Sequence, residues 1–273
     1  MVTFYDTHAH LDYPDFQPDI AEVIQRAEAA GIRRVISIGT DFASSERAIQ
    51  LAERFPSVFA VVGWHPTNAL EAPADLRPTL LKMAAHPKVV AIGETGLDYY
   101  RMPSQKGGTE AEDAHYKERQ ADLFQQQLEV AAESGLNCVV HQRSALEDTI
   151  ACVQPFAGRV RGQFHCFADD AAAMKRILAM GSLVSFTGIV TFKNGQNIRD
   201  TLAATPAKQF MLETDCPYLA PVPYRRGRCE PAHVREIAAV AAETKGCSLE
   251  ELSAATCQAA HEFFPKLTPP RLT

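Results

Sequence analysis

Residues 3–12 read TFYDTHAHLD, a short apolar stretch that leads directly into a group of polar side chains. The apolar and β-branched residues at 3–6 predict a buried β-strand. Open, doubly wound α/β sheets usually carry a glycine-rich phosphate loop after their first strand, and this stretch contains no glycine. The sequence therefore favours a closed barrel of parallel strands over an open sheet.

The rest of the chain alternates between strand-like and helix-like segments. Helical patterns such as DIAEVIQRAEAAG and DLFQQQLEVAAESG end in glycine, which suits a helix C terminus. Eight candidate strands are short and apolar, as expected for strands buried on both faces: residues 3–6, 34–38, 59–63, 89–93, 137–141, 162–165, 183–186 and 210–213. The 273 residues match the roughly 250 typical of one (β/α)8 barrel.

We therefore expect a single (β/α)8 TIM barrel over residues 1–265, followed by a poorly ordered C-terminal tail at 266–273. The polar segment SQKGGTEAEDA at 104–114, with its glycine pair, predicts a mobile loop after the fourth strand. Ser248 and Glu251 have the spacing of a capping box and predict the start of the last helix.

Composition limits the classes of function. The net charge of −6 excludes a strongly basic surface that coats nucleic acid, but a nucleic-acid substrate stays possible if metal ions and local cations meet its phosphates. No apolar stretch is long enough for the core of a signal peptide or for a membrane span. The seven scattered cysteines predict free thiols. We expect a cytoplasmic monomer that does not bind membranes.

Polar residues gather where the candidate strands end. In a (β/α)8 barrel, the C-terminal ends of all strands face one cup, so these residues converge although they lie far apart in sequence. A single histidine at such a place is usually a structural hydrogen-bonder, but a core cannot hold this many polar groups unpaired. The group comprises Asp6, His8, His10, His65, Glu94, Asp98, His141, His165, Glu213 and Asp215.

The types of these side chains predict a metal site. His8 and His10 stand two residues apart on a strand, which puts both imidazoles on the same side and lets them chelate one cation. Imidazole with carboxylate suits Zn, Mn, Fe or Ni, and sites rich in carboxylates also take Mg. The ligands exceed the needs of one tetrahedral ion. They favour two divalent cations about 3.5–4 Å apart that share a bridging carboxylate.

Several blocks of the sequence resemble the TatD-type deoxyribonuclease family over nearly the whole chain. They are DTHAHLD, GWHP, AIGETGLDYYR, VVHQR, FHCF, SFTGIVTFK and MLETDCPYLAPVPYR. The resemblance implies a barrel of the amidohydrolase-like superfamily, divalent metal ions (Mg, Mn or Zn) and hydrolysis of the phosphodiester bonds of DNA. It implies that His8, His10 and Asp215 bind one metal, that His141 and His165 bind the other, and that Glu94 bridges them.

By the same resemblance, Asp215 and Glu94 are the catalytic residues, and Asp215 orients or deprotonates the attacking water. His65 is expected to contact the substrate phosphate. Arg101, Lys193 and Arg225 follow strands on the cup side and are expected to bind the substrate as well, because guanidinium and ammonium groups pair with phosphate. Aromatic residues near the same loops are candidates to stack on unpaired bases: Tyr99, Tyr100, Phe167, Tyr218 and Tyr224.

The favoured function is removal of nucleotides from single-stranded DNA ends. Two other hydrolytic functions stay open, deacylation of D-aminoacyl-tRNA and hydrolysis of a small amide or lactone. A metal-binding protein without catalytic activity is the alternative of another class. The chain departs from the family at Cys229, where asparagine is usual, and at Ser144 or Ala145, where an acid is frequent. The segment after Tyr100 is also longer. These departures bear on substrate choice rather than on metal binding.

Overall fold

Eight parallel strands form the centre of the protein in this computed structural model, which describes residues 2–269. Neighbours in the sheet follow the order of the chain. The ring closes between the first and last strands, where the N–H of Asp215 donates to the His8 carbonyl at 2.9 Å and that of His10 to the Cys216 carbonyl at 2.8 Å. The predicted (β/α)8 barrel is confirmed. The strands are β1 (Phe4–Ala9), β2 (Ile32–Ile38), β3 (Val58–Val62), β4 (Val89–Asp98), β5 (Asn137–Arg143), β6 (Gly162–Phe164), β7 (Leu183–Phe186) and β8 (Phe210–Leu212).

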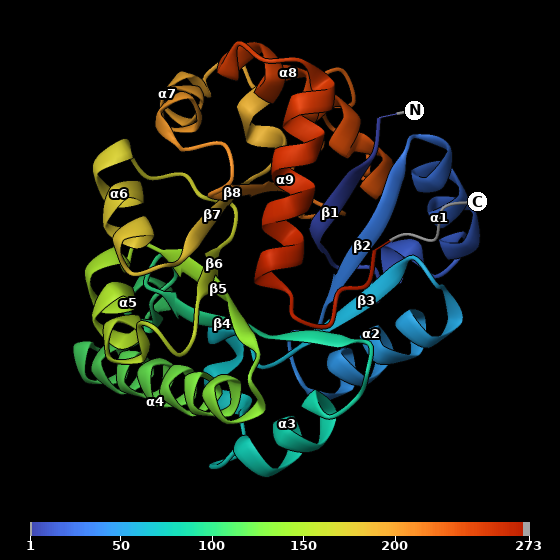
Figure 1. Ribbon diagram of the computed structural model, residues 1–273. Coiled ribbons are helices and arrows are strands. Elements are labelled where there is room, and N and C mark those ends of the chain that lie inside the picture. Colours follow the sequence, from blue (N-terminus) through green and yellow to red (C-terminus); the bar gives the residue numbers. More distant parts are fainter. Residues whose placement is uncertain (1, 270–273) are drawn as a thin grey trace.

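Helices surround the barrel and alternate with its strands (Figure 1). The long α4 is followed by Gly135 at its C terminus, whose φ of 68° lies in the left-handed region that glycine adopts without strain. The predicted capping box of Ser248 and Glu251 begins α9. The helices are α1 (Ile20–Ala29), α2 (Phe42–Arg54), α3 (Arg77–Ala84), α4 (Glu110–Ser134), α5 (Leu146–Val153), α6 (Ala171–Ala179), α7 (Gln196–Ala204), α8 (Val234–Lys245) and α9 (Leu249–Phe263).

One end of the barrel is closed by apolar packing. Tyr5, Ile36, Phe59 and Met211 form a buried cluster with Phe263 of α9, and Figure 1 shows α9 lying across this end. Each large apolar side chain buried there contributes roughly 1.5–3 kcal/mol. Because this apolar plug fills the N-terminal ends of the strands, the polar residues are confined to the opposite, C-terminal end.

Four strands are longer than the sequence predicts, namely β1, β2, β4 and β5, and the extensions of β1 and β4 carry residues of the polar group. β1 continues to Ala9 and β4 to Asp98, whereas we expected ends at residues 6 and 93. Glu94 and Asp98 therefore lie within β4, not after it. The predicted ends were placed near the first polar residues, but the backbone keeps its strand pairing there, with Gly96 opposite His141 and Asp98 opposite Arg143.

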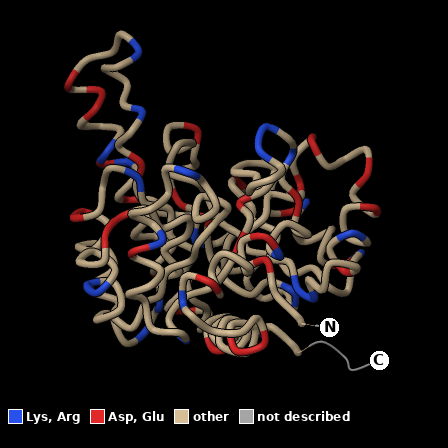
Figure 2. The backbone as a smooth tube through the Cα atoms, turned by 90° about the horizontal axis from the view of Figure 1, so that it is seen from above, with Lys and Arg blue, Asp and Glu red and all other residues tan. Residues whose placement is uncertain are grey.

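The segment at 104–114 is organised, contrary to the prediction of a mobile loop. It contains a short 3-10 helix, Pro103–Lys106, and the first residues of α4. Thr109 and Glu112 form a capping box at the start of α4, and Ser104 donates to Asp113 through both its N–H, at 2.8 Å, and its hydroxyl, at 2.6 Å. The spacing of Thr109 and Glu112 is the signal that the prediction overlooked. Figure 2 shows loops that stand out above the barrel on the side away from the two chain ends.

The predicted tail at 266–273 packs against the barrel where the structure describes it. Leu267 is buried, and the Thr268 carbonyl accepts a hydrogen bond from Arg34 Nε at 2.9 Å. Residues 270–273 lie outside the described part. All seven cysteines are free thiols, as predicted. Among residues 2–269, no helix combines the length and the apolar composition needed to cross a bilayer.

Candidate metal centre

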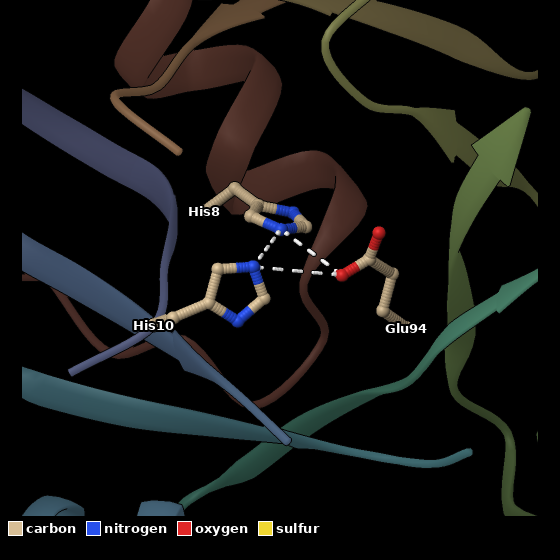
Figure 3. Close-up of side chains that lie close together, drawn as sticks. All are labelled: His8, His10 and Glu94. Carbon is tan, nitrogen blue, oxygen red and sulfur yellow. Dashed lines mark hydrogen bonds and ion pairs between the residues drawn. The ribbon is translucent and has the colours of Figure 1, made fainter. Parts of the chain in front are cut away.

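Four side chains from three strand ends meet at the C-terminal end of the barrel and form what we call the first cluster: His8, His10, Asp215 and the Oε2 atom of Glu94. The Nε2 atoms of His8 and His10 are 3.4 Å apart. Each lies within 3.7 Å of Glu94 Oε2 and within 3.7 Å of Asp215 Oδ1. Figure 3 shows both imidazoles and the Glu94 carboxylate turned toward one another.

The other oxygen of Glu94 belongs to a second cluster, formed by Glu94 Oε1 with His65, His141 and His165. His165 Nε2 lies 2.7 Å from Oε1, His141 Nδ1 lies 2.9 Å from it and His65 Nε2 lies 3.3 Å from it. His141 Nδ1 and His165 Nε2 are 3.2 Å apart. The structure thus brings together all six predicted metal ligands and adds His65, which we expected only as a contact to substrate.

The spacing of these atoms fits cations. A tetrahedral ion with ligand bonds of about 2.0–2.1 Å holds its ligand atoms about 3.3 Å apart. The five measured separations in the first cluster run from 3.4 to 3.7 Å. Two imidazole Nε2 atoms facing each other with carboxylate oxygens around them satisfy one another poorly without a positive charge between them. The donor set of both clusters therefore suits divalent metal ions.

The electrostatics of the centre favour ionised carboxylates and a neutral His8. Burial opposes ionisation of Glu94, but the surrounding imidazoles, above all His165, outweigh it and hold its pKa well below the ordinary value. Asp215 has a lowered pKa, since its hydrogen bond to His10 and the nearby imidazoles outweigh its burial. Burial, reinforced by His165, lowers the pKa of His8 to about 4. At neutral pH, His8 therefore offers an unprotonated nitrogen.

His141 contrasts with His8, because its surroundings raise its pKa and favour the protonated form, as those of His10 and His165 also do. Burial lowers its pKa, but hydrogen bonds to Asp98 and Glu94 raise it to about 9. Its Nε2 lies 3.1 Å from Asp98 Oδ2, so Nδ1 faces Glu94. A metal ion in the second cluster would displace the proton on Nδ1, because a ligating imidazole must be neutral.

The backbone of β4 fixes the position of His141. Gly96 pairs with His141 across the sheet and has a φ of 135°. A Cβ atom at Gly96 would lie 2.0 Å from the His141 carbonyl oxygen. Asp98, two residues further along, is held by its N–H, which donates to Gln120 Oε1 at 2.8 Å. Only glycine lets the two strands approach closely enough for Asp98 to reach the His141 ring.

A second buried carboxyl group supports the centre from β8. Glu213 Oε2 accepts hydrogen bonds from Ser185 Oγ at 2.7 Å and Gln163 Nε2 at 2.9 Å, and Oε1 accepts one from the Cys166 N–H at 2.6 Å. Burial raises the pKa of Glu213 to about 7. Glu213 Oε1 lies 3.8 Å from His165 Nδ1, so this network ties β6, β7 and β8 together directly behind the second cluster.

The residues predicted to bind substrate lie on loops around the centre. Arg101, Lys193 and Arg225 are exposed and follow β4, β7 and β8 respectively. Their contact with substrate stays a prediction, as does that of His65. Sequence reasoning missed Arg143, which follows His141 by two residues on β5; this period of two was the available signal. It also missed Tyr13, whose ring stacks on His10 with centroids 4.8 Å apart.

Comparisons with known proteins agree with this centre. A family model described as TatD related DNase matches residues 5–265. A Bacillus subtilis protein named as an uncharacterized metal-dependent hydrolase, YabD, is 34% identical over 261 residues, which cover 95% of this chain and 98% of that protein. A protein of Citrobacter rodentium named as the 3′-5′ ssDNA/RNA exonuclease TatD is 32% identical over 267 residues, 95% of this chain and 97% of that one.

Solved structures show the same relationship. The crystal structure of YJJV, a TatD homolog from Escherichia coli K12, has a TM-score of 0.86 and 26% identity, covering 98% of this chain and all of that one. An organophosphorus hydrolase from Deinococcus radiodurans shares the fold alone, with a TM-score of 0.60 and 13% identity, over 97% of this chain and 93% of that one. The sequence match over almost the whole chain places this protein in the TatD-related DNase family of metal-dependent hydrolases.

Proposed function

We propose that this protein is a phosphodiesterase that removes nucleotides from single-stranded nucleic-acid ends, using two divalent cations, one in each cluster. The observation that carries the proposal is the Glu94 carboxylate, which turns one oxygen toward each cluster. Two cations joined by such a carboxylate suit phosphodiester cleavage, since one site serves the attacking oxygen and the other the leaving oxygen. The relatives named as ssDNA/RNA exonucleases support the choice of substrate.

When bound, the cations would lower the pKa of water toward about 7 and offset the charge that develops on the phosphate oxygens. The protein's own part falls first to Asp215, whose carboxylate is ionised at neutral pH because of His10 and its other imidazole neighbours. An ionised carboxylate at the centre accepts the proton of the attacking water within hydrogen-bond reach. Glu94 orients both clusters relative to each other, and the buried imidazoles keep the donor atoms in place.

The mouth of the centre carries the features that a nucleic-acid strand requires. The protein as a whole is acidic, with a net charge of −6, so attraction of a polyanion depends on local cations. Cationic side chains lie over aromatic rings at three places in or after the segments that follow β4, β5, β7 and β8: Lys117 of α4 over Tyr99, Arg143 at the end of β5 over Tyr100, and Arg225 over Phe192. Such surfaces combine phosphate binding with stacking platforms for bases.

The test combines metal analysis with digestion of labelled DNA. Protein loaded with Mg, Mn or Zn is expected to hold two ions per chain and to shorten an end-labelled single-stranded oligonucleotide one nucleotide at a time. Chelator should stop the reaction, because both clusters lose their cations. Labels at either end of the oligonucleotide show from which end digestion starts. We expect digestion to start at the 3′ end, because some relatives are named as 3′-5′ exonucleases. D-aminoacyl-tRNA and a panel of lactones serve as competing substrates; cleavage of one of these without cleavage of DNA would overturn the proposal.

A further inference from the structure

Arg143 occupies a distinctive position at the end of β5. It follows the metal-ligating candidate His141 by two residues, and alternate residues of a strand point to the same side. His141 faces the second cluster, so Arg143 projects on that side one step nearer to the mouth. Its side chain is exposed, and no acidic group among residues 2–269 forms an ion pair with it. Asp98 lies opposite Arg143 in the sheet but forms no ion pair with it, so the guanidinium keeps hydrogen-bonding capacity for an anion.

The guanidinium of Arg143 is nevertheless held in a defined orientation. Its Cζ lies 3.6 Å from the centroid of the Tyr100 ring, and Tyr100 is itself 50% exposed. The backbone on both sides is tied down, since the Tyr99 N–H donates to the Arg143 carbonyl at 2.9 Å and the Tyr100 N–H donates to Asp98 Oδ1 at 2.9 Å. A stacked guanidinium keeps its edge N–H groups free for an anion and loses little entropy on binding.

Asp98 connects this pair to the metal centre. One of its oxygens accepts from the Tyr100 N–H, and the other contacts His141 Nε2 at 3.1 Å. The backbone N–H of Tyr100, whose ring lies under Arg143, and the imidazole of His141 therefore contact the same carboxylate. This links the position of the Arg143 guanidinium to that of the second cluster.

A similar pair stands elsewhere on the same mouth. Arg225, in the connection after β8, lies with its Cζ 3.7 Å from the centroid of Phe192, in the connection after β7. Around the barrel, the β4–β5 edge and the β7–β8 edge are separated by β6 on one side and by β1, β2 and β3 on the other. The two stacked guanidinium groups thus flank the metal centre, and a strand that crosses the centre would pass both.

We propose that Arg143, stacked on Tyr100, binds the phosphate next to the bond that is cleaved, and so sets the register of a single-stranded substrate in the centre. The inference rests on the proposed nuclease function and adds a specific subsite to it. An arginine stacked on a surface tyrosine is frequently only a packing contact. Here the position beside His141, the free N–H edge and the shared Asp98 favour binding.

A chemical cycle tests this assignment directly. Oligothymidylates in which one linkage at a time is a neutral methylphosphonate are digested by wild-type protein and by Arg143→Ala, both loaded with metal. Loss of one charge-assisted contact should raise KM roughly tenfold. At one linkage, the methylphosphonate should raise the KM of the wild-type protein by the same factor. The same methylphosphonate should not change the KM of Arg143→Ala, because the protein variant and the neutral linkage remove the same contact. If the effects of Arg143→Ala and of the methylphosphonate on KM multiplied at every linkage, the proposal would be wrong.

Salt dependence supplies a readout other than activity. Binding of a fluorescent single strand to the full chain is measured in the presence of chelator at several salt concentrations. The logarithm of the binding constant should fall with the logarithm of the salt concentration, by a slope of about 0.7 for each phosphate contact. Arg143→Ala should reduce the slope by about that amount, whereas Arg143→Lys keeps the charge, retains the slope and loses affinity through the missing fork. Arg159→Ala is the matched control, since Arg159 stacks on Phe156 before β6, at the opposite end of the barrel, and should change nothing.

The outcomes separate the two proposals. A wild-type protein that neither binds nor cleaves single strands contradicts the nuclease function, and the Arg143 subsite is then wrong as well. Cleavage by wild-type protein with an unchanged slope and KM in Arg143→Ala contradicts the subsite alone. Metal content and thermal unfolding of Arg143→Ala should match wild type, which shows that its defect does not arise from a damaged centre.

Discussion

The two clusters of the metal centre are built differently although they share Glu94. The first cluster has two carboxylates and two imidazoles, and the second has one carboxylate and three imidazoles. The first lies deeper: the His8 side chain is fully buried, whereas that of His141 is 17% exposed. Charge and burial therefore favour firm retention of a cation in the first cluster, and openness favours exchange and substrate contact at the second.

The supports of the two clusters differ as well. The Nδ1 atoms of His8 and His10 are buried and have no hydrogen-bond partner among the described residues. Ring packing orients them, His8 against His165 at a centroid distance of 4.0 Å and His10 against Tyr13. In the second cluster, His165 Nδ1 also lacks a hydrogen-bond partner among the described residues, but Asp98 supports His141 through a hydrogen bond. Outer residues should therefore tune the second cluster more than the first.

Glu94→Gln should have the largest effect, because it removes the one carboxylate that both clusters use. Deleting one partner of a buried charged group costs about 3–5 kcal/mol, which corresponds to a loss in kcat/KM of about 10²- to 10⁴-fold. Metal analysis should show both ions lost or weakened together. The same substitution at exposed Glu147, which pairs with Arg176, is the control. Loss of only one ion would show that Glu94 belongs to a single cluster.

Asp215→Asn should affect the first cluster selectively. It removes the proposed proton acceptor and one ligand, and loss of a general base lowers kcat by about 10²–10³-fold. The second ion should remain, which equilibrium dialysis with metal quantification can measure. A variant that keeps the wild-type kcat would show that another group accepts the proton, and Asp215 would then be a ligand only.

Gly96→Ala should damage the second cluster through the backbone. The new Cβ would lie 2.0 Å from the His141 carbonyl oxygen at a φ of 135°, and strain with overpacking costs about 2–3 kcal/mol. Gly107 is a matched control, since its φ is 90° but no atom lies within 4 Å of a Cβ there; alanine should cost only about 1 kcal/mol. Urea unfolding of the metal-free variants measures both values. Equal losses would exclude the clash as the cause.

The barrel and the convergence of the six ligand candidates could be predicted from the sequence, because each depends on a local signal. Buried parallel strands are apolar, and the polar side chains that follow them, such as His8 and His165, can only meet at one end. The resemblance to a family then assigned each ligand candidate to one of the two metal ions. Sequence reasoning could not show that His65 reaches Glu94, because this depends on how β3 and β4 are placed relative to each other.

Other features escaped for similar physical reasons. The role of Asp98 depends on the extension of β4 past Glu94. We expected the strand to end there because the sequence contains glycines, which are unusual inside strands. The stacking of Arg143 on Tyr100 depends on the pairing between β4 and β5, which no single segment encodes. Two local signals were available and overlooked: the capping-box spacing of Thr109 and Glu112 and the period of two between His141 and Arg143 on β5.

Asp98→Asn should have the smallest effect and most sharply separates the clusters. An asparagine keeps the shape but removes the charge that orients His141, and substitutions of such outer residues weaken metal binding by about 10–100-fold. The weaker ion should be the one in the second cluster only, because the Nδ1 atoms of His8 and His10 have no hydrogen-bond partner among the described residues. Stepwise metal titration measures the two affinities, and Asp98→Glu should recover part of the loss. If both affinities fell equally, the two clusters would respond as one rigid unit, and the difference in their supports would have no energetic consequence.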